Sequence, residues 1–235
     1  MRFQYMSDLH LEFDSNTEFF RKNSFQVEGD ILILAGDICN LKHRQVADII
    51  PFRSYKRVFW VYGNHEYYGS DLTDHHANSV TFMDDICVIQ TTLWSYIPDQ
   101  VSSFCEHSLN DFRRIRRRNE LLRASTYNAL HRSSMDFLEN ALNSYSFMKT
   151  VVITHHAPTF ENYPEQYKGS MISCCFATDL NNLILKYQPN YWVYGHTHGN
   201  TPDFKIGETQ MLTNQVGYVR NNEHLGFNMK AAFEL

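Results

Sequence analysis

No stretch of this sequence approaches the ~18 consecutive apolar residues that a membrane-spanning helix requires. The chain starts MRFQYMSDLH and so reaches a polar motif without an apolar segment behind a basic start. We therefore expect neither a membrane partner nor a secretory signal. An excess of positive charge is also missing, because the formal net charge is -5. This balance disfavours charge-driven binding of nucleic acid over the whole surface.

Cysteine is sparse and shows no CxxC spacing. The five cysteines are odd in number, and the adjacent pair Cys174 and Cys175 is poorly placed for a mutual disulfide. This pattern favours a reducing, cytoplasmic location. Repeats, low-complexity tracts and Pro/Gly-rich linkers are absent too, so no domain boundary is indicated. With 235 residues, 43% of them apolar, we predict a single domain over residues 1–235.

Short apolar runs rich in β-branched and aromatic residues predict strands that are buried on both faces. Longer segments between them repeat apolar residues every three or four positions and predict helices. The expected strands are Phe3–Met6, Ile31–Ala35, Val58–Tyr62, Ile86–Leu93, Thr150–Thr154, Tyr191–Tyr194, Gln210–Asn214 and Gly226–Phe233. The expected helices are Lys42–Ile50, Asn119–Ser144 and Thr178–Tyr187. The alternation of these elements indicates an α/β fold.

Five of the predicted strands end directly in groups of Asp, Asn or His. In chain order these groups read SDLH, GDICN, GNHE, HHAP and GHTH. Ligands of α/β proteins bind at the carboxyl ends of strands, where such loops converge. We therefore expect one site built from residues far apart in the sequence.

The residue types in these groups fit divalent metal ions, because carboxylate oxygen and imidazole nitrogen together suit Mn, Fe, Zn, Co or Ni. If residues 8–10 are extended, the two-residue spacing places the side chains of Asp8 and His10 on the same face. His196 and His198 have the same spacing. Seven ligands are too many for one ion but suit two ions that share Asp37. The seven are Asp8, His10, Asp37, Asn64, His155, His196 and His198. The glycines that precede Asp37, Asn64 and His196 suit a close backbone approach.

The ordered series of motifs from Ser7 to His198 resembles the calcineurin-like metallophosphoesterase superfamily, whose pattern is DxH, GDxxD, GNH[DE], H and GHxH. The resemblance implies a four-layer αββα sandwich of two mixed β-sheets flanked by helices. It also implies a hydrolase that uses two divalent ions, with Mn²⁺ the expected activator in vitro. One ion would bind Asp8, His10, Asp37 and His198, and the other Asp37, Asn64, His155 and His196.

Two metal ions in such a site lower the pKa of a bridging water from 15.7 toward ~7, and the resulting hydroxide attacks phosphorus. His65 remains free in this scheme and is predicted to protonate the leaving group, an effect typically worth 10²- to 10⁴-fold. Asn40 departs from the pattern, because GDxxD places an acid there that commonly supports the catalytic histidine. The pKa of His65 is then lower, or Glu66 or another carboxylate takes over the support of the histidine.

Two further residues are candidate substrate contacts. His156 follows His155 directly and either points toward substrate or packs against its neighbour. Arg113 begins the only dense charge run, which continues to Arg118 and reads either as a solvated face or as a phosphate-binding segment.

The substrate class is only partly restricted by the sequence. Protein phosphatases of the calcineurin type usually carry an arginine in the GDxxD block and another in the GNHE block. This chain has Asn40-Leu41-Lys42 and Tyr67-Tyr68 at these places, which disfavours a phosphoprotein as substrate. A nucleotide, a small phosphodiester or a nucleic acid is expected instead, as a phosphomonoester or a phosphodiester. A non-catalytic scaffold of the same fold that binds a protein partner is the alternative, but no ligand is missing. A lactamase-like enzyme would need an HxHxDH motif, which is absent. The oligomeric state is left open.

Overall fold

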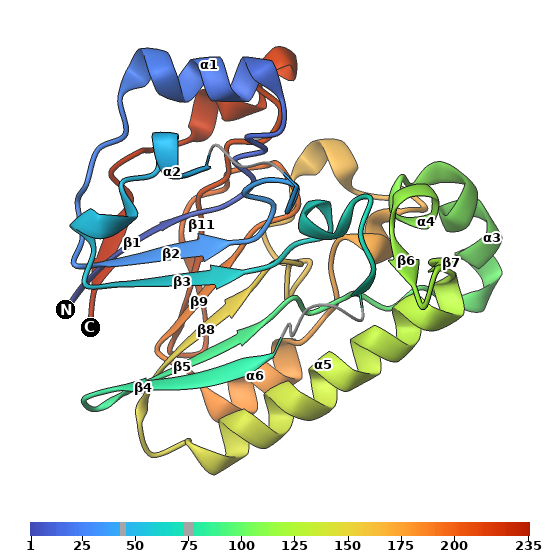
Figure 1. Cartoon of the computed structure of the whole chain (residues 1–235). Helices are drawn as coiled ribbons and strands as arrows, with labels where there is room; N and C mark the ends of the chain where they lie inside the picture. The colour runs from blue at the N-terminus through green and yellow to red at the C-terminus, as the bar shows by residue number, and fades with distance from the viewer. Residues whose placement is uncertain (43–45, 73–77) are drawn as a thin grey trace.

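A computed structural model describes residues 1–42, 46–72 and 78–235, and most of its strands lie in two large sheets (Figure 1). The first sheet has four strands in the order β12-β1-β2-β3. They are Ala232–Glu234, Arg2–Met6, Ile31–Ala35 and Arg57–Val61. The strands β1, β2 and β3 are parallel, so their carboxyl ends lie at the same edge, and β12 is antiparallel to β1.

The second sheet has six strands in the order β10-β11-β9-β8-β5-β4. They are Phe204–Ile206, Thr209–Thr213, Tyr191–Tyr194, Lys149–Thr154, Ile86–Thr91 and Ser79–Met83. Its four inner strands are parallel and its two edge strands are antiparallel to their neighbours. A separate small hairpin consists of β6 (Arg116–Arg117) and β7 (Glu120–Leu121).

Helices cover the outer faces of both sheets (Figure 1). The helices α1 (Asp14–Asn23) and α2 (Val46–Ile49) lie over the first sheet, and α5 (Ala124–Ser144) and α6 (Asn181–Tyr187) lie over the second. The helices α3 (Asp99–Ser108) and α4 (Asp111–Arg114) lie to one side, near the small hairpin. Short 3₁₀ segments are Phe52–Ser54, His65–Tyr67, Glu165–Tyr167, Ser173–Cys175, Val219–Asn221 and Glu223–Gly226.

The layers are held by three apolar cores, one between the sheets and one between each sheet and its helices. Ile33 and Val151 belong to the core between the sheets, while Leu32 and Leu34 point to the helices on the other side. Both faces of β2 are therefore buried, which explains its uninterrupted apolar sequence. Each such side chain contributes roughly 1.5–3 kcal/mol on burial. The predicted four-layer αββα sandwich is confirmed.

Several predicted boundaries differ from the structure. The helix predicted from residue 119 begins at Ala124, because Glu120–Leu121 pair with Arg116–Arg117 across a turn with positive φ at Arg118 and Asn119. The strand predicted over 226–233 is reduced to Ala232–Glu234. In the helix predicted over 42–50, α2 spans Val46–Ile49, and positions 43–45 lie outside the described residues. No helix among the described residues has the length and apolar character needed to cross a membrane.

Candidate metal centre

Loops at the carboxyl ends of five strands meet at one edge of the sandwich, as the motif positions predicted. Asp8 follows β1, Asp37 follows β2 and Asn64 follows β3. His155 follows β8, and the pair His196 and His198 follows β9. The first sheet supplies the carboxylates and the amide, and the second sheet supplies three imidazoles.

The ligand atoms of these residues fall into overlapping groups in which all atoms lie within 4.8 Å of one another. The groups are Asp8 with His10 and His198, His10 with Asp37 and His65, and Asp37 with His155 and His196. Asp37 belongs to two of them. Apart from half-buried His198, all of these residues are buried. The structure thus brings the predicted donors together around a shared carboxylate.

The backbone brings these side chains together differently from our expectation. Asp8 and His10 are not in an extended segment, since their φ angles are 54° and 46°. Asp37, His196 and His198 also have positive φ. Such angles are uncommon outside glycine, and clusters of them mark sites where the surrounding structure holds a strained backbone. The tight left-handed turns, rather than strand alternation, direct the five side chains inward.

Glycines make room for the same side chains. A Cβ at Gly36 would lie 2.3 Å from His155 Nδ1, and one at Gly195 would lie 2.5 Å from Asp8 Oδ2. At Gly63 a Cβ would lie 2.2 Å from Asp37 Oδ1 and 2.6 Å from His155 Nε2. No side chain can occupy these positions unless the candidate ligands move.

We expect Gly63→Ala to weaken metal binding by at least ~10-fold, because the added methyl group displaces the Asp37 carboxylate. Isothermal titration with Mn²⁺ measures the change. Gly226→Ala is the matched control, since its Cβ approaches only the Asn200 side chain, at 3.1 Å. An unchanged Mn²⁺ affinity in Gly63→Ala would contradict a metal role for Asp37.

Four imidazoles hydrogen-bond an oxygen on the side away from the centre. His10 Nδ1 lies 3.2 Å from Glu12 Oε1, and His198 Nδ1 lies 2.7 Å from Glu223 Oε2. His155 Nδ1 lies 2.9 Å from the Ala35 carbonyl, and His196 Nε2 lies 3.3 Å from the Cys175 carbonyl. Acceptors in these positions fix the tautomer, so the second nitrogen of each ring presents a lone pair to the centre. This outer arrangement is typical of metal-binding histidines.

The inward nitrogens face other acceptors. His10 Nε2 lies 2.9 Å from His198 Nε2, and His155 Nε2 lies 3.1 Å from Asn64 Oδ1 and 3.4 Å from Asp37 Oδ1. When Nδ1 of His10 and Nδ1 of His198 carry the protons, the contact between their Nε2 atoms joins two lone pairs, whereas protonated His155 donates from Nε2 in the metal-free chain. A cation between the two lone pairs removes the repulsion, so the donor set fits metal ions on the geometry of the chain itself.

Protonation in the chain without metal differs among the imidazoles. Burial, together with the charge of neighbouring histidines, lowers the pKa of His10 and His196. For His155 the nearby Asp37 carboxylate outweighs burial and raises the pKa to about 10. Metal binding must therefore displace a proton from His155, and metal affinity should rise with pH.

Asp111 positions the Asn64 amide and was not predicted. Its Oδ1 accepts hydrogen bonds from Asn64 Nδ2 at 2.9 Å and from the Tyr68 hydroxyl at 2.7 Å. With the amide nitrogen held in this way, Asn64 Oδ1 is turned toward His155 and the centre. Asp111 is buried, and a buried acid beside an Arg run offered no motif to identify it.

Glu12 supports His65, the role that the sequence left open at Asn40. Its Oε1 lies 2.7 Å from His65 Nδ1 and also contacts His10. Asn40 instead bonds the Tyr68 carbonyl and the Lys42 amide. Glu66 accepts from four donors around the β2 and β3 loops, which are the amides of Asp37, Ile38 and Gly63 and the Trp60 indole. Glu66 was thus the wrong candidate for the support of His65, and another carboxylate takes this place.

The two candidate substrate contacts lie away from the cavity. His156 is fully buried, with Nε2 3.0 Å from the Tyr127 hydroxyl and Nδ1 3.2 Å from the Thr92 carbonyl. Its ring packs beside His196, with the centroids 4.1 Å apart, which agrees with the packing interpretation. Arg113 is exposed and donates to the His107 carbonyl. Neither residue lines the cavity described next.

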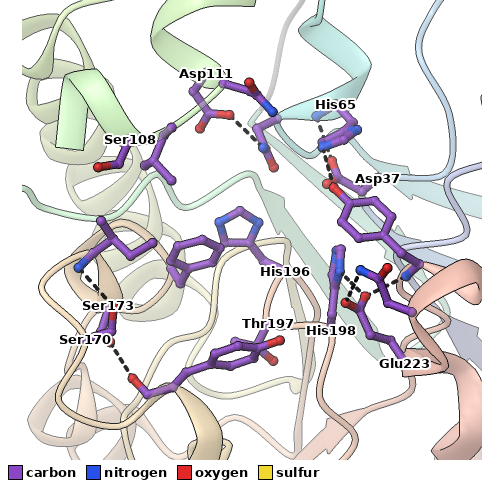
Figure 2. A pocket seen from close by; sticks show the side chains of 18 of the residues that line it. Asp37, His65, Ser108, Asp111, Ser170, Ser173, His196, Thr197, His198 and Glu223 are labelled. Carbon is purple, nitrogen blue, oxygen red and sulfur yellow. Dashed lines mark hydrogen bonds and ion pairs between the residues drawn. The ribbon is translucent and has the colours of Figure 1, made fainter.

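A cavity of about 310 Å³ opens over the centre (Figure 2). Asp37, His65 and His198 lie along one side of it, and Ser170 and Ser173 lie across from them. The other lining residues are mainly aromatic or small and polar. They include Tyr68, Leu109, Tyr163, Tyr167, Ile172, Phe176 and Tyr218.

Comparisons with known proteins agree with this arrangement. The family described as calcineurin-like phosphoesterase matches residues 1–200. An uncharacterized protein of Acanthamoeba polyphaga mimivirus is 30% identical over 274 residues, covering 99% of this chain and 96% of that protein. The crystal structure of a phosphopantetheinyl hydrolase from Mycobacterium tuberculosis matches with a TM-score of 0.71 and 17% identity, over 93% of this chain and 90% of that one. This last likeness is one of fold.

Proposed function

Because the chain belongs to the calcineurin-like phosphoesterase family and is a metal-dependent phosphoester hydrolase, we propose that it hydrolyses a small phosphodiester at the centre described above. The observation that carries the proposal is the membership of Asp37 in two adjacent donor groups. A shared carboxylate is the feature expected of a two-metal centre. In our assignment Asp8, His10, Asp37 and His198 hold one cation, and Asp37, Asn64, His155 and His196 hold the other.

When bound, the two divalent cations supply Lewis acidity and an acidified water as nucleophile. The mixed nitrogen and oxygen donors accept Mn, Fe, Zn, Co or Ni, and we propose Mn²⁺ as the activator in vitro. Three carboxylates of the chain hold the proposed ligands in place. Asp111 turns the Asn64 amide oxygen toward the centre. Glu12 and Glu223 hydrogen-bond the outer nitrogens of His10 and His198.

His65 is the proposed proton donor to the leaving alkoxide. It lies at the cavity wall, and its ring packs on Tyr68 with the centroids 4.1 Å apart. Burial lowers the pKa of His65, but Asp37 and Glu12 outweigh this effect and raise it to about 8. Asp37 and Glu12 therefore favour, in the metal-free chain, the imidazolium form that proton donation needs.

The lining of the cavity favours a diester over a monoester. No Lys or Arg occurs among the described residues that line it. Arg114 and Arg220 instead lie over the rings of Tyr68 and Tyr218, at 5.6 and 5.8 Å from the centroids. A phosphomonoester carries close to two negative charges at pH 7, as phosphorylated side chains do. A diester carries one, which needs no cation beyond the two metals.

The size and chemistry of the cavity indicate a small organic arm on the phosphate. About 310 Å³ lies at the lower end of small-molecule pockets, which favours a small substrate. The wall formed by Tyr163, Tyr167, Ile172 and Phe176 offers apolar and aromatic surface to such an arm. A nucleoside or an acyl-like chain fits this description, whereas a polyphosphate tail does not.

A substrate panel tests the proposed class. Mn²⁺-loaded protein should show a higher kcat/KM for bis(4-nitrophenyl) phosphate than for 4-nitrophenyl phosphate. Because a phosphopantetheinyl hydrolase shares the fold, a phosphopantetheinylated peptide belongs in the panel with cyclic nucleotides and single-stranded RNA. Preference for the monoester or for RNA would overturn the small-diester assignment.

Glu12→Gln is expected to move the alkaline limb of the pH profile to lower pH. A proton donor fails as pH rises through its pKa, and loss of the Glu12 charge lowers the pKa of His65. Bound metal cations also lower this pKa, so the displacement between the two proteins is the informative quantity. The profile of kcat/KM for an alkyl phosphodiester measures it.

Glu223→Gln is the matched control, because Glu223 lies behind His198 and is not among the groups that raise the pKa of His65. It should weaken Mn²⁺ binding, by roughly 10- to 100-fold, and leave the alkaline limb in place. Identical limbs in wild type and Glu12→Gln would refute the coupling of Glu12 to His65.

We also propose a reducing, cytoplasmic location for the protein. All five cysteines are free thiols in the structure, and four of them are buried. This state supports the proposal, since disulfides are rare in such a compartment.

A further inference from the structure

Three of the cysteines form a cluster outside the catalytic centre. The sulfur atoms of Cys105, Cys174 and Cys175 all lie within 4.8 Å of one another. Cys105 and Cys175 are buried, and Cys174 is half-buried. Cys105 comes from α3 and the other two from the 3₁₀ segment Ser173–Cys175, so about 70 positions of sequence separate the two sides of the cluster.

The cluster joins two segments of the chain that line the substrate cavity. Just beyond Cys105, the end of α3 and the following loop contribute Ser108 and Leu109 to the lining. On the other side, Ile172, Ser173 and Phe176 flank the adjacent cysteine pair and line the same cavity. The thiols, which do not line the cavity themselves, therefore meet where these two segments contact each other.

The geometry suits a tetrahedral thiolate centre. A Zn–S bond of about 2.3 Å places neighbouring sulfurs roughly 3.8 Å apart, which falls within the 4.8 Å limit of the cluster. A disulfide between the adjacent pair is disfavoured by its geometry. Three sulfurs within 4.8 Å of one another instead offer one ion three ligands, and the half-buried side of Cys174 leaves access for a water as the fourth.

We propose that Cys105, Cys174 and Cys175 form a thiolate site for a borderline-soft divalent cation of the zinc type, separate from the catalytic pair. Each thiol that binds releases its proton to solvent as the metal–sulfur bond forms, and no redox step is involved. A divalent ion is favoured over a soft monovalent one, since three thiolates then leave a single negative charge rather than two in partly apolar surroundings.

Local hydrogen bonds prepare the site. Hydrogen bonds from the Cys175 and Cys105 thiols to its sulfur outweigh burial and lower the pKa of Cys174 to about 7. The surrounding apolar cluster, which contains Trp94, Phe112 and Tyr127, excludes competing ligands from the buried side.

Occupancy would stabilise the catalytic centre from outside. The Cys175 carbonyl accepts from His196 Nε2 at 3.3 Å and from the Tyr127 hydroxyl at 2.8 Å. The next residue, Phe176, stacks on the His196 ring with the centroids 4.7 Å apart. An ion bound to Cys175 would fix both contacts and tie together the two segments that line the cavity beside the cluster.

Cadmium is a suitable probe, because its thiolates absorb in the ultraviolet by charge transfer and its nitrogen and oxygen complexes do not. Reduced full-length protein is first saturated with Mn²⁺, which prefers oxygen and nitrogen donors, and then titrated with Cd²⁺. We expect the thiolate band to saturate at one Cd²⁺ per chain. Asp37→Ala should retain the band, which separates this site from the catalytic pair.

Two variants test the assignment of the ligands. Cys105→Ala and Cys174→Ser should lose at least half of the band amplitude, and the second alters a half-buried position where misfolding is a small risk. Cys87→Ala is the matched control, because Cys87 is an equally buried cysteine outside the cluster. Circular dichroism verifies that each variant is folded. Absence of the band in the wild type, or full amplitude in Cys174→Ser, would overturn the proposal.

Discussion

Asp37→Ala is expected to lower kcat/KM for a phosphodiester by about 10³-fold or more, equivalent to ~4 kcal/mol of transition-state stabilisation. The carboxylate of Asp37 belongs to two donor groups, so under the proposed assignment its loss should weaken the binding of both cations rather than one. Loss of a single electrostatic contact in an active site typically costs 10²- to 10³-fold. Because the binding of both cations is weakened, the loss of activity should lie at or above the upper end of that range.

The loss has a structural component that the control must exclude. Asp37 Oδ1 also accepts the His65 backbone amide at 2.8 Å, so its removal releases the β3 loop as well. Asp37→Asn retains an acceptor for that amide but not the charge, and it should remain as inactive as the alanine variant. Asp30→Ala, at the opposite end of β2, should retain wild-type turnover, because its half-buried carboxylate contacts Lys56 and the Arg2 amide, far from the centre. Substantial activity in Asp37→Asn would show that charge at this position is dispensable.

His65→Asn is expected to produce the second-largest effect, and the effect should depend on the leaving group. A proton donor contributes roughly 10²- to 10⁴-fold when an alkoxide departs. Nitrophenolate is stable without a proton, so the same variant should lose much less activity on a nitrophenyl diester. Parallel kcat measurements on an alkyl and a nitrophenyl diester separate the two cases.

His107→Ala serves as the control for this experiment, because His107 lies exposed on α3 and its ring nitrogen bonds the Ser103 carbonyl of its own helix. It should have wild-type activity on both diesters. An equal loss by His65→Asn on both substrates would assign His65 to positioning or metal binding instead of proton donation. Its place in a donor group with His10 and Asp37 makes that outcome a meaningful alternative.

The core of the fold and the inner donors were predictable because their signals are local. The run Ile31–Ala35 is apolar at every position, and the structure places a strand over the same five residues. Asp37 follows that strand within two residues, so the position of the donor is determined by the position of the strand. The same reasoning located Asn64, His155 and His196 at the ends of their strands.

The supporting carboxylates were not predictable, since each acts on a residue far away in the chain. Asp111 contacts Asn64 across 47 positions, and Glu12 contacts His65 across 53. Glu223 lies 25 positions beyond His198. It belongs to the 3₁₀ segment Glu223–Gly226 and falls between the two last predicted strands. A single Glu or Asp without a motif gives no sign of such a partner. Only Glu12 offered a local hint, because it stands two residues after His10.

The helix boundaries failed for a related reason. The apolar spacing of residues 119–144 suits a helix throughout, but Arg118 and Asn119 adopt positive φ and turn the chain into a hairpin. Backbone hydrogen bonds between Arg116–Arg117 and Glu120–Leu121 then compete with the first helical turn. Asn tolerates the left-handed conformation, which was the available signal for a turn at this point.

Metal titration of the wild-type protein tests the two-cation centre most directly. Protein stripped with a chelator should be inactive on bis(4-nitrophenyl) phosphate, and turnover should return as Mn²⁺ is added, reaching a plateau at two ions per chain. Turnover that survives chelation, or full activity with a single Mn²⁺ per chain, would contradict an active site built on two cations bridged by Asp37.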